Sequence, residues 1–139
     1  MDKQYTNSIF ILEKAKREIE HIINTSETKS FDDKKAQQIL SGAIENIESS
    51  VLEIKHFSKD TKQGSLYKLS NGKWAFDTEY EKEIYFSCGY PAEIFNEKEN
   101  QWDSGRIEHT NGEYYFFNYD ERNLELYEGM LVRVRVGNL

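Results

Sequence analysis

Residues 105–118, with the sequence GRIEHTNGEYYFFN, decide the fold of the second half of the chain. Asn111-Gly112 divides this stretch into two runs, and the second run is rich in aromatic residues. An Asn-Gly pair between such runs is the strongest short-range signal for a β-hairpin, because both residues tolerate a positive φ. The same pair occurs at Asn71-Gly72, between the runs 66–69 and 73–76. The sequence therefore predicts at least two β-hairpins after residue 60.

Two more segments of the second half have the composition of strands. Residues 92–95 follow a turn at 88–91, and residues 130–136 alternate, with three valines on one face and Arg133 and Arg135 on the other. Five or six short strands with turns every ~8–12 residues are typical of a small barrel or a curled sheet. Residues 61–139 are therefore predicted to form a small antiparallel β-barrel or curled sheet.

The first half of the chain has a helical pattern instead. Apolar residues recur every three or four positions from Asp2 to Asn24, and again from Ser30 to about Phe57. Ser30 is expected to cap the second helix. A short polar link between two helices favours an antiparallel hairpin. We thus predict an α+β fold with two domains, a helical hairpin at 1–60 and the β domain at 61–139, joined by a polar linker at 58–64.

The whole chain is acidic and contains a single cysteine. It has 139 residues with 18 basic and 25 acidic side chains, for a net charge of −7. This balance argues against a general binder of phosphate backbones, because such binding depends on surplus positive charge. Cys88 alone can form neither an internal disulfide nor a multi-cysteine metal site. No apolar run approaches the ~20 residues that span a bilayer, and no signal-peptide core follows Met1, so we expect a soluble, cytoplasmic protein.

Several short blocks in the second half resemble a known family. They are Cys88-Gly89 with 92–95, then Trp102, then 105–108, then Gly112 with Tyr114-Tyr115, and finally Glu128-Gly129 with 132–135. In this order they are similar to an uncharacterised small β-domain family of low-GC Gram-positive bacteria, their phages and their conjugative elements. The resemblance covers about the last 75 residues and implies a compact, SH3-like or curled-sheet module with no assigned activity. In size and charge the chain also resembles small acidic inhibitors from such elements, notably anti-CRISPR proteins.

The sequence offers no catalytic or metal-binding set, and it predicts no cofactor. A nucleophile needs a base within hydrogen-bond reach, and His21, His56 and His109 show no supporting spacing with Cys88. Zinc would need Cys or His in short pairs, which the chain lacks. The acidic run 77–83 lacks the central glycine of a calcium loop. We therefore expect no enzymatic activity. A small enzyme is the third hypothesis, after an interaction protein and a nucleic-acid-binding module.

A nucleic-acid-binding module remains as the alternative. The aromatic cluster at 114–119, with Arg106, Arg133 and Arg135, is of the kind that small barrels use to stack single strands. Against this reading, the window 77–128 contains 14 acids and 4 bases, and its net charge of −10 would repel phosphates. The arginines also have acidic residues available as partners across the strands.

The same acidic window supplies the residues that we expect to bind a protein partner. Glu79, Glu81 and Glu83 alternate, so on an extended segment they would point the same way. Aromatic residues beside the acids would serve as apolar anchors. The predicted partner-binding residues are Asp77, Glu79, Tyr80, Glu81, Glu83, Tyr90, Glu97, Glu99, Trp102 and Asp103. The alternative is that the acids only keep a small, aromatic-rich domain soluble.

The apolar residues of the two predicted helices outnumber those that one helix–helix interface uses. They are Ile9, Leu12, Ile19, Ile23, Ile39, Leu40, Ile47, Val51 and Ile54. They are expected either to pack against the β domain or to pair with a second copy in a four-helix bundle. Of these two arrangements we expect the homodimer.

Together these features predict a non-enzymatic interaction protein of a phage or mobile element that acts in the host cytoplasm. Its acidic surface would compete for a nucleic-acid-binding partner, gaining fast, electrostatically steered association. A CRISPR nuclease is the concrete partner that the resemblance to anti-CRISPR proteins implies. The alternative is a nucleic-acid-binding or regulatory β-barrel module that uses Arg133, Arg135 and surface aromatics.

Overall fold

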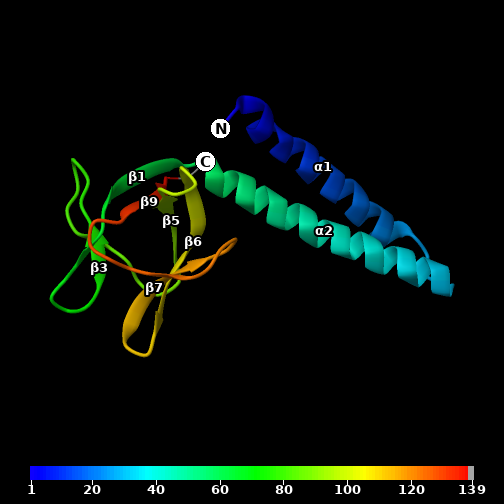
Figure 1. Ribbon diagram of the computed structural model, residues 1–139. Helices are drawn as coiled ribbons and strands as arrows, with labels where there is room; N and C mark the ends of the chain where they lie inside the picture. Colours follow the sequence, from blue (N-terminus) through cyan, green and yellow to red (C-terminus); the bar gives the residue numbers. More distant parts are fainter. Residues whose placement is uncertain (138–139) are drawn as a thin grey trace. The chain divides into compact units, whose positions relative to one another are not determined.

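The computed structural model describes residues 1–137, which divide into two compact units, Met1–Lys59 and a second unit that begins at Asp60 (Figure 1). The first unit consists of two helices and the second of short strands. The predicted α+β fold class is therefore confirmed.

The helical unit is an antiparallel hairpin of α1 (Lys3–Thr25) and α2 (Phe31–Phe57), as predicted (Figure 1). Its antiparallel direction is shown by ion pairs between the helices: Lys16 Nζ lies 3.1 Å from Glu48 Oε1, and Lys55 Nζ lies 3.6 Å from Glu13 Oε1. The later residue on α2 thus pairs with the earlier one on α1. Ser30 caps α2 as expected, because its hydroxyl accepts a hydrogen bond from the backbone N–H of a residue in the first turn.

The hairpin buries few of its own apolar residues. Within the described helices only Ile9 and Val51 are buried. The large apolar side chains of the helices that remain exposed are Tyr5, Phe10, Ile11, Ile22, Phe31, Ile39 and Leu52. Neither described helix combines the length and the apolar character needed to cross a bilayer.

The β unit contains two antiparallel sheets. Its described strands are β1 (Asp60–Ser65), β2 (Tyr67–Lys68), β3 (Trp74–Phe76), β4 (Ile84–Tyr85), β5 (Tyr90–Asn96), β6 (Gln101–Thr110), β7 (Glu113–Asn118), β8 (Leu124–Glu125) and β9 (Leu131–Val136). The larger sheet has the order β1-β9-β5-β6-β7-β8, and the smaller has the order β2-β3-β4. Among the described residues no ladder joins β1 to β8, so the domain is a curled sheet and not a closed barrel.

The expected linker at 58–64 is wrong for most of its length. Residues from Asp60 onward form β1, which pairs with β9 at the edge of the larger sheet, so that Asp60 lies opposite Val136 and Ser65 opposite Leu131. Figure 1 shows these first and last strands of the unit side by side. The polar side chains of β1 suit an edge strand, because one side of such a strand is open to solvent and charged side chains there discourage pairing with another chain.

Both predicted Asn-Gly hairpins are present. β6 and β7 pair antiparallel up to Thr110 and Glu113, and Asn111 and Gly112 between them have φ values of 53° and 81°. These positive values are what a tight two-residue connection requires. The hairpin of β2 and β3 likewise turns through Gly72, with a φ of 87°.

The described residues of the β unit form one apolar core inside the curled sheet. Its largest fully buried side chains come from strands of both sheets and from the turns between them: Leu66, Phe76, Phe86, Ile107, Phe116, Val132 and Val134. The inward residues of β9 are the valines of the predicted alternation. The core is thus formed by contacts between segments far apart in the sequence.

Candidate functional site

The acidic segment 77–83 is a compact turn, so the expected extended array of Glu79, Glu81 and Glu83 is wrong. The backbone N–H of Thr78 donates to the carbonyl oxygen of Glu81 at 2.8 Å, and Glu83 has a φ of 50°. Alternate residues of a turn do not share one face. These three carboxylates therefore do not form a regular row.

Asp77 is the residue that holds this turn in shape. Its Oδ1 accepts hydrogen bonds from the Tyr67 hydroxyl at 2.6 Å and from the Glu83 backbone N–H at 2.8 Å. The bond between the two side chains raises the pKa of Tyr67 to about 12 and holds the pKa of the Asp77 carboxyl below its usual value. Asp77 thus has a structural role, in addition to the partner-binding role predicted for it.

Other acids of the segment differ in their exposure and pairing. Lys62 forms an ion pair with Glu81 at 2.6 Å, whereas among the described residues no cation pairs with Glu79. Tyr80 is 91% exposed and contacts little of its own chain. Glu79 and Tyr80 are therefore the residues of this segment that a partner can reach most easily.

The two other aromatic residues predicted as anchors are engaged within the β unit. Tyr90 is half-buried, and its ring lies 5.5 Å from that of Phe86. Trp102 is also half-buried, with the guanidinium carbon of Arg133 4.2 Å from its ring centroid. Both rings present only part of their surface to a partner.

Asp103 is a buried carboxylate, although the sequence places it among surface acids. It accepts hydrogen bonds from the side-chain amides of Asn96 at 3.2 Å, Asn118 at 3.1 Å and Gln101 at 3.3 Å. It lies on the inward face of β6, together with Gly105 and Ile107. This amide-bound carboxylate links β5, β6 and β7 at one end of the larger sheet.

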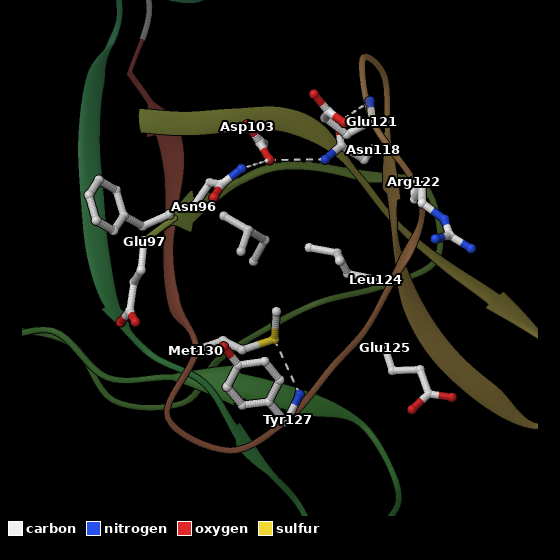
Figure 2. A pocket seen from close by; sticks show the side chains of 12 residues that line it. Asn96, Glu97, Asp103, Asn118, Glu121, Arg122, Leu124, Glu125, Tyr127 and Met130 are labelled. Atoms are coloured by element: carbon white, nitrogen blue, oxygen red, sulfur yellow. Dashed lines mark hydrogen bonds between the residues drawn. The ribbon is translucent and has the colours of Figure 1, made fainter. Parts of the chain in front are cut away.

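A hollow of about 300 Å³ opens beside this network (Figure 2). Its lining residues are Ile94, Phe95, Asn96, Glu97, Asp103, Asn118, Glu121, Arg122, Leu124, Glu125, Tyr127 and Met130. In Figure 2, Leu124 and Met130 point toward the middle of the hollow, and Glu97 and Glu125 lie on opposite sides of it. The hollow thus has an apolar interior and an acidic rim, for which we use the name acidic hollow.

Of the ten predicted residues, the acidic hollow brings together only Glu97 and Asp103. Glu99 lies in the nearby turn between β5 and β6 but does not line the hollow. Glu121 and Glu125 also line the hollow and are not among the residues predicted from the sequence. The signal that points to them is Asn118, whose side-chain oxygen accepts from the backbone N–H of residues 120 and 121, at 3.1 Å each, and so turns the chain back across the hollow.

Arg133 and Arg135 both bind the buried Glu93. Arg133 Nη2 lies 2.8 Å from Glu93 Oε1, and Arg135 Nε lies 2.8 Å from Glu93 Oε2. Burial by itself raises the pKa of the Glu93 carboxyl, but the hydrogen bonds and charges of the two arginines outweigh it and leave that pKa below its usual value. The cationic ends of these arginines are therefore committed to a partner in their own chain.

Cys88 and His109 each contact a side chain of a neighbouring strand, and among the described residues no hydrogen bond joins the two. The Cys88 thiol is exposed and donates to Glu108 Oε2 at 3.2 Å, and the His109 ring lies 4.4 Å from that of Tyr114. Within residues 1–137 no three His, Cys, Asp or Glu side chains come together in a way that would hold a metal ion.

The fold and the acidic hollow define a small curled-sheet module that follows a helical hairpin. Residues 64–134 match the family model of a domain of unknown function, DUF5348, and this match covers just over half of the chain. The protein therefore belongs to the DUF5348 family, and the prediction of an uncharacterised small domain in the second half is confirmed. Comparisons with curated proteins and with solved structures found no match.

Proposed function

We propose that this protein is a non-enzymatic interaction protein whose acidic β unit competes with nucleic acid for a cationic surface on a partner protein. The observation that carries the proposal is an imbalance in how the charges of the β unit are used. Five of the nine basic side chains described in this unit form ion pairs with its own acids, whereas many of its acids remain exposed and form no ion pair with a described residue. A net negative field then extends from the surface of the unit.

Five cations illustrate the first half of this imbalance. Arg133 and Arg135 bind Glu93, Arg106 binds Glu108, Lys62 binds Glu81 and Lys82 binds Asp77. By contrast, the exposed acids that form no ion pair with any described residue include Glu79, Glu97, Glu99, Glu113, Asp120, Glu121 and Glu125. A cationic protein surface is the complement of such a surface, and attraction between the two accelerates association.

The most specific form of this proposal is an inhibitor, carried by a phage or mobile element, that blocks a CRISPR nuclease. Such a nuclease holds its nucleic acid in a positively charged channel. An acidic domain of this size can compete for a channel of that kind without any chemical step. The resemblance of the chain to anti-CRISPR proteins in size and charge supports this version.

The same ion pairs argue against the nucleic-acid-binding alternative. Arg133 and Arg135 are the cations on which it rests, and their guanidinium groups already bind Glu93. What favours it is the aromatic pair of Phe117 and Tyr119, whose ring centroids lie 6.0 Å apart. Arg106 lies over both rings, at 4.4 and 5.7 Å, but its guanidinium also binds Glu108. A base could stack on this aromatic pair.

A competition assay tests the proposal. Labelled guide RNA or target DNA is bound to a candidate CRISPR nuclease, and the fluorescence anisotropy is followed as the protein is added. We expect the anisotropy to fall, and the effect to weaken as salt rises from about 50 to about 200 mM, because screening shortens the range of the attraction. Labelled nucleic acid without the nuclease is the control, and it should not respond. A rise in the control would favour the nucleic-acid-binding alternative.

A further inference from the structure

We propose that the acidic hollow is the docking site for one kind of partner segment: a peptide stretch with a bulky apolar side chain flanked by arginine or lysine. This inference deepens the proposed function and rests on it, since it says which part of the acidic surface makes the specific contact. The apolar side chain would enter the hollow, and the cations would meet its rim.

The interior of the hollow is suited to an apolar side chain. Ile94, Leu124 and Met130 line it, and Leu124 remains 37% exposed although it points inward. Its volume of about 300 Å³ lies at the lower end of the range for small-molecule sites. A hollow of this size takes one large side chain and its neighbours more readily than a whole cofactor. Anchor side chains of this kind carry most of the energy of protein interfaces.

The rim of the hollow selects for positive charge. Among the described residues that line it are three glutamates, at 97, 121 and 125, and one cation, Arg122. The carboxylate of Asp103 lies at the edge of the same hollow and is bound by amides, with no described cation paired to it. These negative charges reinforce one another inside a concave surface, where low-dielectric walls concentrate the field. Charge complementarity therefore commits the occupant to a basic segment.

The hollow is formed before any partner binds. Figure 2 shows Asp103 joined to Asn96 and Asn118 across its upper side, and the Met130 sulfur accepting the backbone N–H of Tyr127 at 3.2 Å across its lower side. These bonds hold the ends of β5, β6 and β7 and the connections beside β8. A preformed site avoids the cost of ordering loops when a partner binds.

The test measures binding of a defined probe to the full chain. The probe is a short, capped, fluorescent peptide of alternating arginine and leucine. Its controls have serine in place of leucine, or glutamate in place of arginine. We expect the first peptide to bind, and both control peptides to bind at least about tenfold more weakly, because each lacks one of the two features that the hollow recognises.

Matched variants of the protein show where the peptide binds. Charge reversal at the rim, Glu97→Lys with Glu121→Lys and Glu125→Lys, should weaken binding of the arginine-leucine peptide by at least about tenfold. The same change of net charge at three exposed acids that neither line the hollow nor belong to the predicted partner-binding residues, Asp60→Lys with Glu113→Lys and Glu128→Lys, should weaken it by no more than about threefold. Leu124→Ser, which leaves the charge unchanged, should also weaken it. All these side chains are exposed, and thermal melts check that each variant is folded.

The outcomes are separable from those of the competition assay. Equal losses in the two triple variants would mean that diffuse charge alone attracts the peptide, and they would overturn the inference while leaving the proposed function intact. Lack of any binding by wild-type protein would overturn it as well. Peptide binding that requires the rim and Leu124, together with no competition against nucleic acid, would support the hollow as a docking site and refute the proposed function. A two-dimensional NMR titration should in addition shift the side-chain amides of Asn96 and Asn118.

Discussion

Replacement of Glu93 by alanine should destabilise the β unit severely. Glu93 lies on β5 directly opposite Arg133 of β9, and it receives hydrogen bonds from the side chains of Arg133 and Arg135 at 2.8 to 3.1 Å. The side chain of Glu93 is only 5% exposed, and those of the two arginines are 21% and 13% exposed. The substitution would therefore leave two cations half-buried without their common anion.

The magnitude follows from the cost of an uncompensated charge. Breaking a buried ion pair by removal of one partner costs roughly 3–5 kcal/mol. Because the arginines keep some contact with solvent, and Arg133 also lies over the Trp102 ring, we expect the lower end, about 3 kcal/mol. For a small domain this loss corresponds to a urea midpoint about 1–3 M lower.

Tryptophan fluorescence measures this loss in the β unit alone, since both tryptophans, Trp74 and Trp102, belong to it. Glu93→Gln keeps the shape but removes the charge, and it serves as the matched control for pH. The pKa of Glu93 is lower in the folded state than the ordinary 4.5, so its charge stabilises the fold above that value, and this contribution is lost as the pH falls through the folded pKa. The advantage of wild type over Glu93→Gln should therefore shrink below about pH 4.5.

A loss below about 1 kcal/mol for Glu93→Ala would refute this reasoning. It would place the cluster with surface salt bridges, which solvent screens and which contribute little. The ion pairs of Arg133 and Arg135 with Glu93 would then no longer argue against the nucleic-acid-binding alternative.

Four other changes test the fold and the assembly. Ser30→Ala should cost about 1 kcal/mol in the helical unit, measured by thermal melting followed at 222 nm, because it removes the cap of α2. Gly105→Ala should cost at least about 3 kcal/mol by urea unfolding, because a Cβ there would overlap the backbone of β7. Tyr67→Phe should remove the tyrosine that titrates near pH 12 in absorbance at 295 nm and should cost about 1 kcal/mol. Ile11 and Ile22 are exposed on one face of α1, three turns apart. We therefore expect a dimer in sedimentation velocity, and a monomer when both are changed to Lys.

The parts of the fold that could be predicted from the sequence depend on short-range signals. The cap at Ser30 and the helical period up to Phe57 lie within one element, and the Asn111-Gly112 turn lies between two adjacent strands. In each case the residues that decide the structure are within a few positions of one another. β1 could not be predicted this way, because its polar sequence becomes a strand only through pairing with β9, about 70 residues later.

Asp103 shows how a boundary error changes the interpretation of a site. The strand predicted from the sequence begins at residue 105, whereas β6 begins at Gln101. When the strand is extended by four residues toward its start, side chains still alternate between the two faces, and Asp103 falls on the inward face with Ile107. The Asp103 carboxylate then accepts hydrogen bonds from the side-chain amides of Asn96 and Asn118, on the two neighbouring strands. No local sequence pattern predicts these contacts.

The acidic window illustrates a more general limit. A count of charges along the sequence treats every arginine of the β unit as equally available, yet the antiparallel pairing of β5 with β9 places Glu93 against Arg133, 40 positions away. Because Glu93 binds both Arg133 and Arg135 and neutralises one of their two charges, the basic end of the chain offsets the carboxylates around the acidic hollow by less than its sequence suggests. The charge that a partner would meet is therefore set by the topology of the sheet as much as by composition. This is why two segments with opposite net charges in the sequence are consistent with one largely acidic surface in the folded domain.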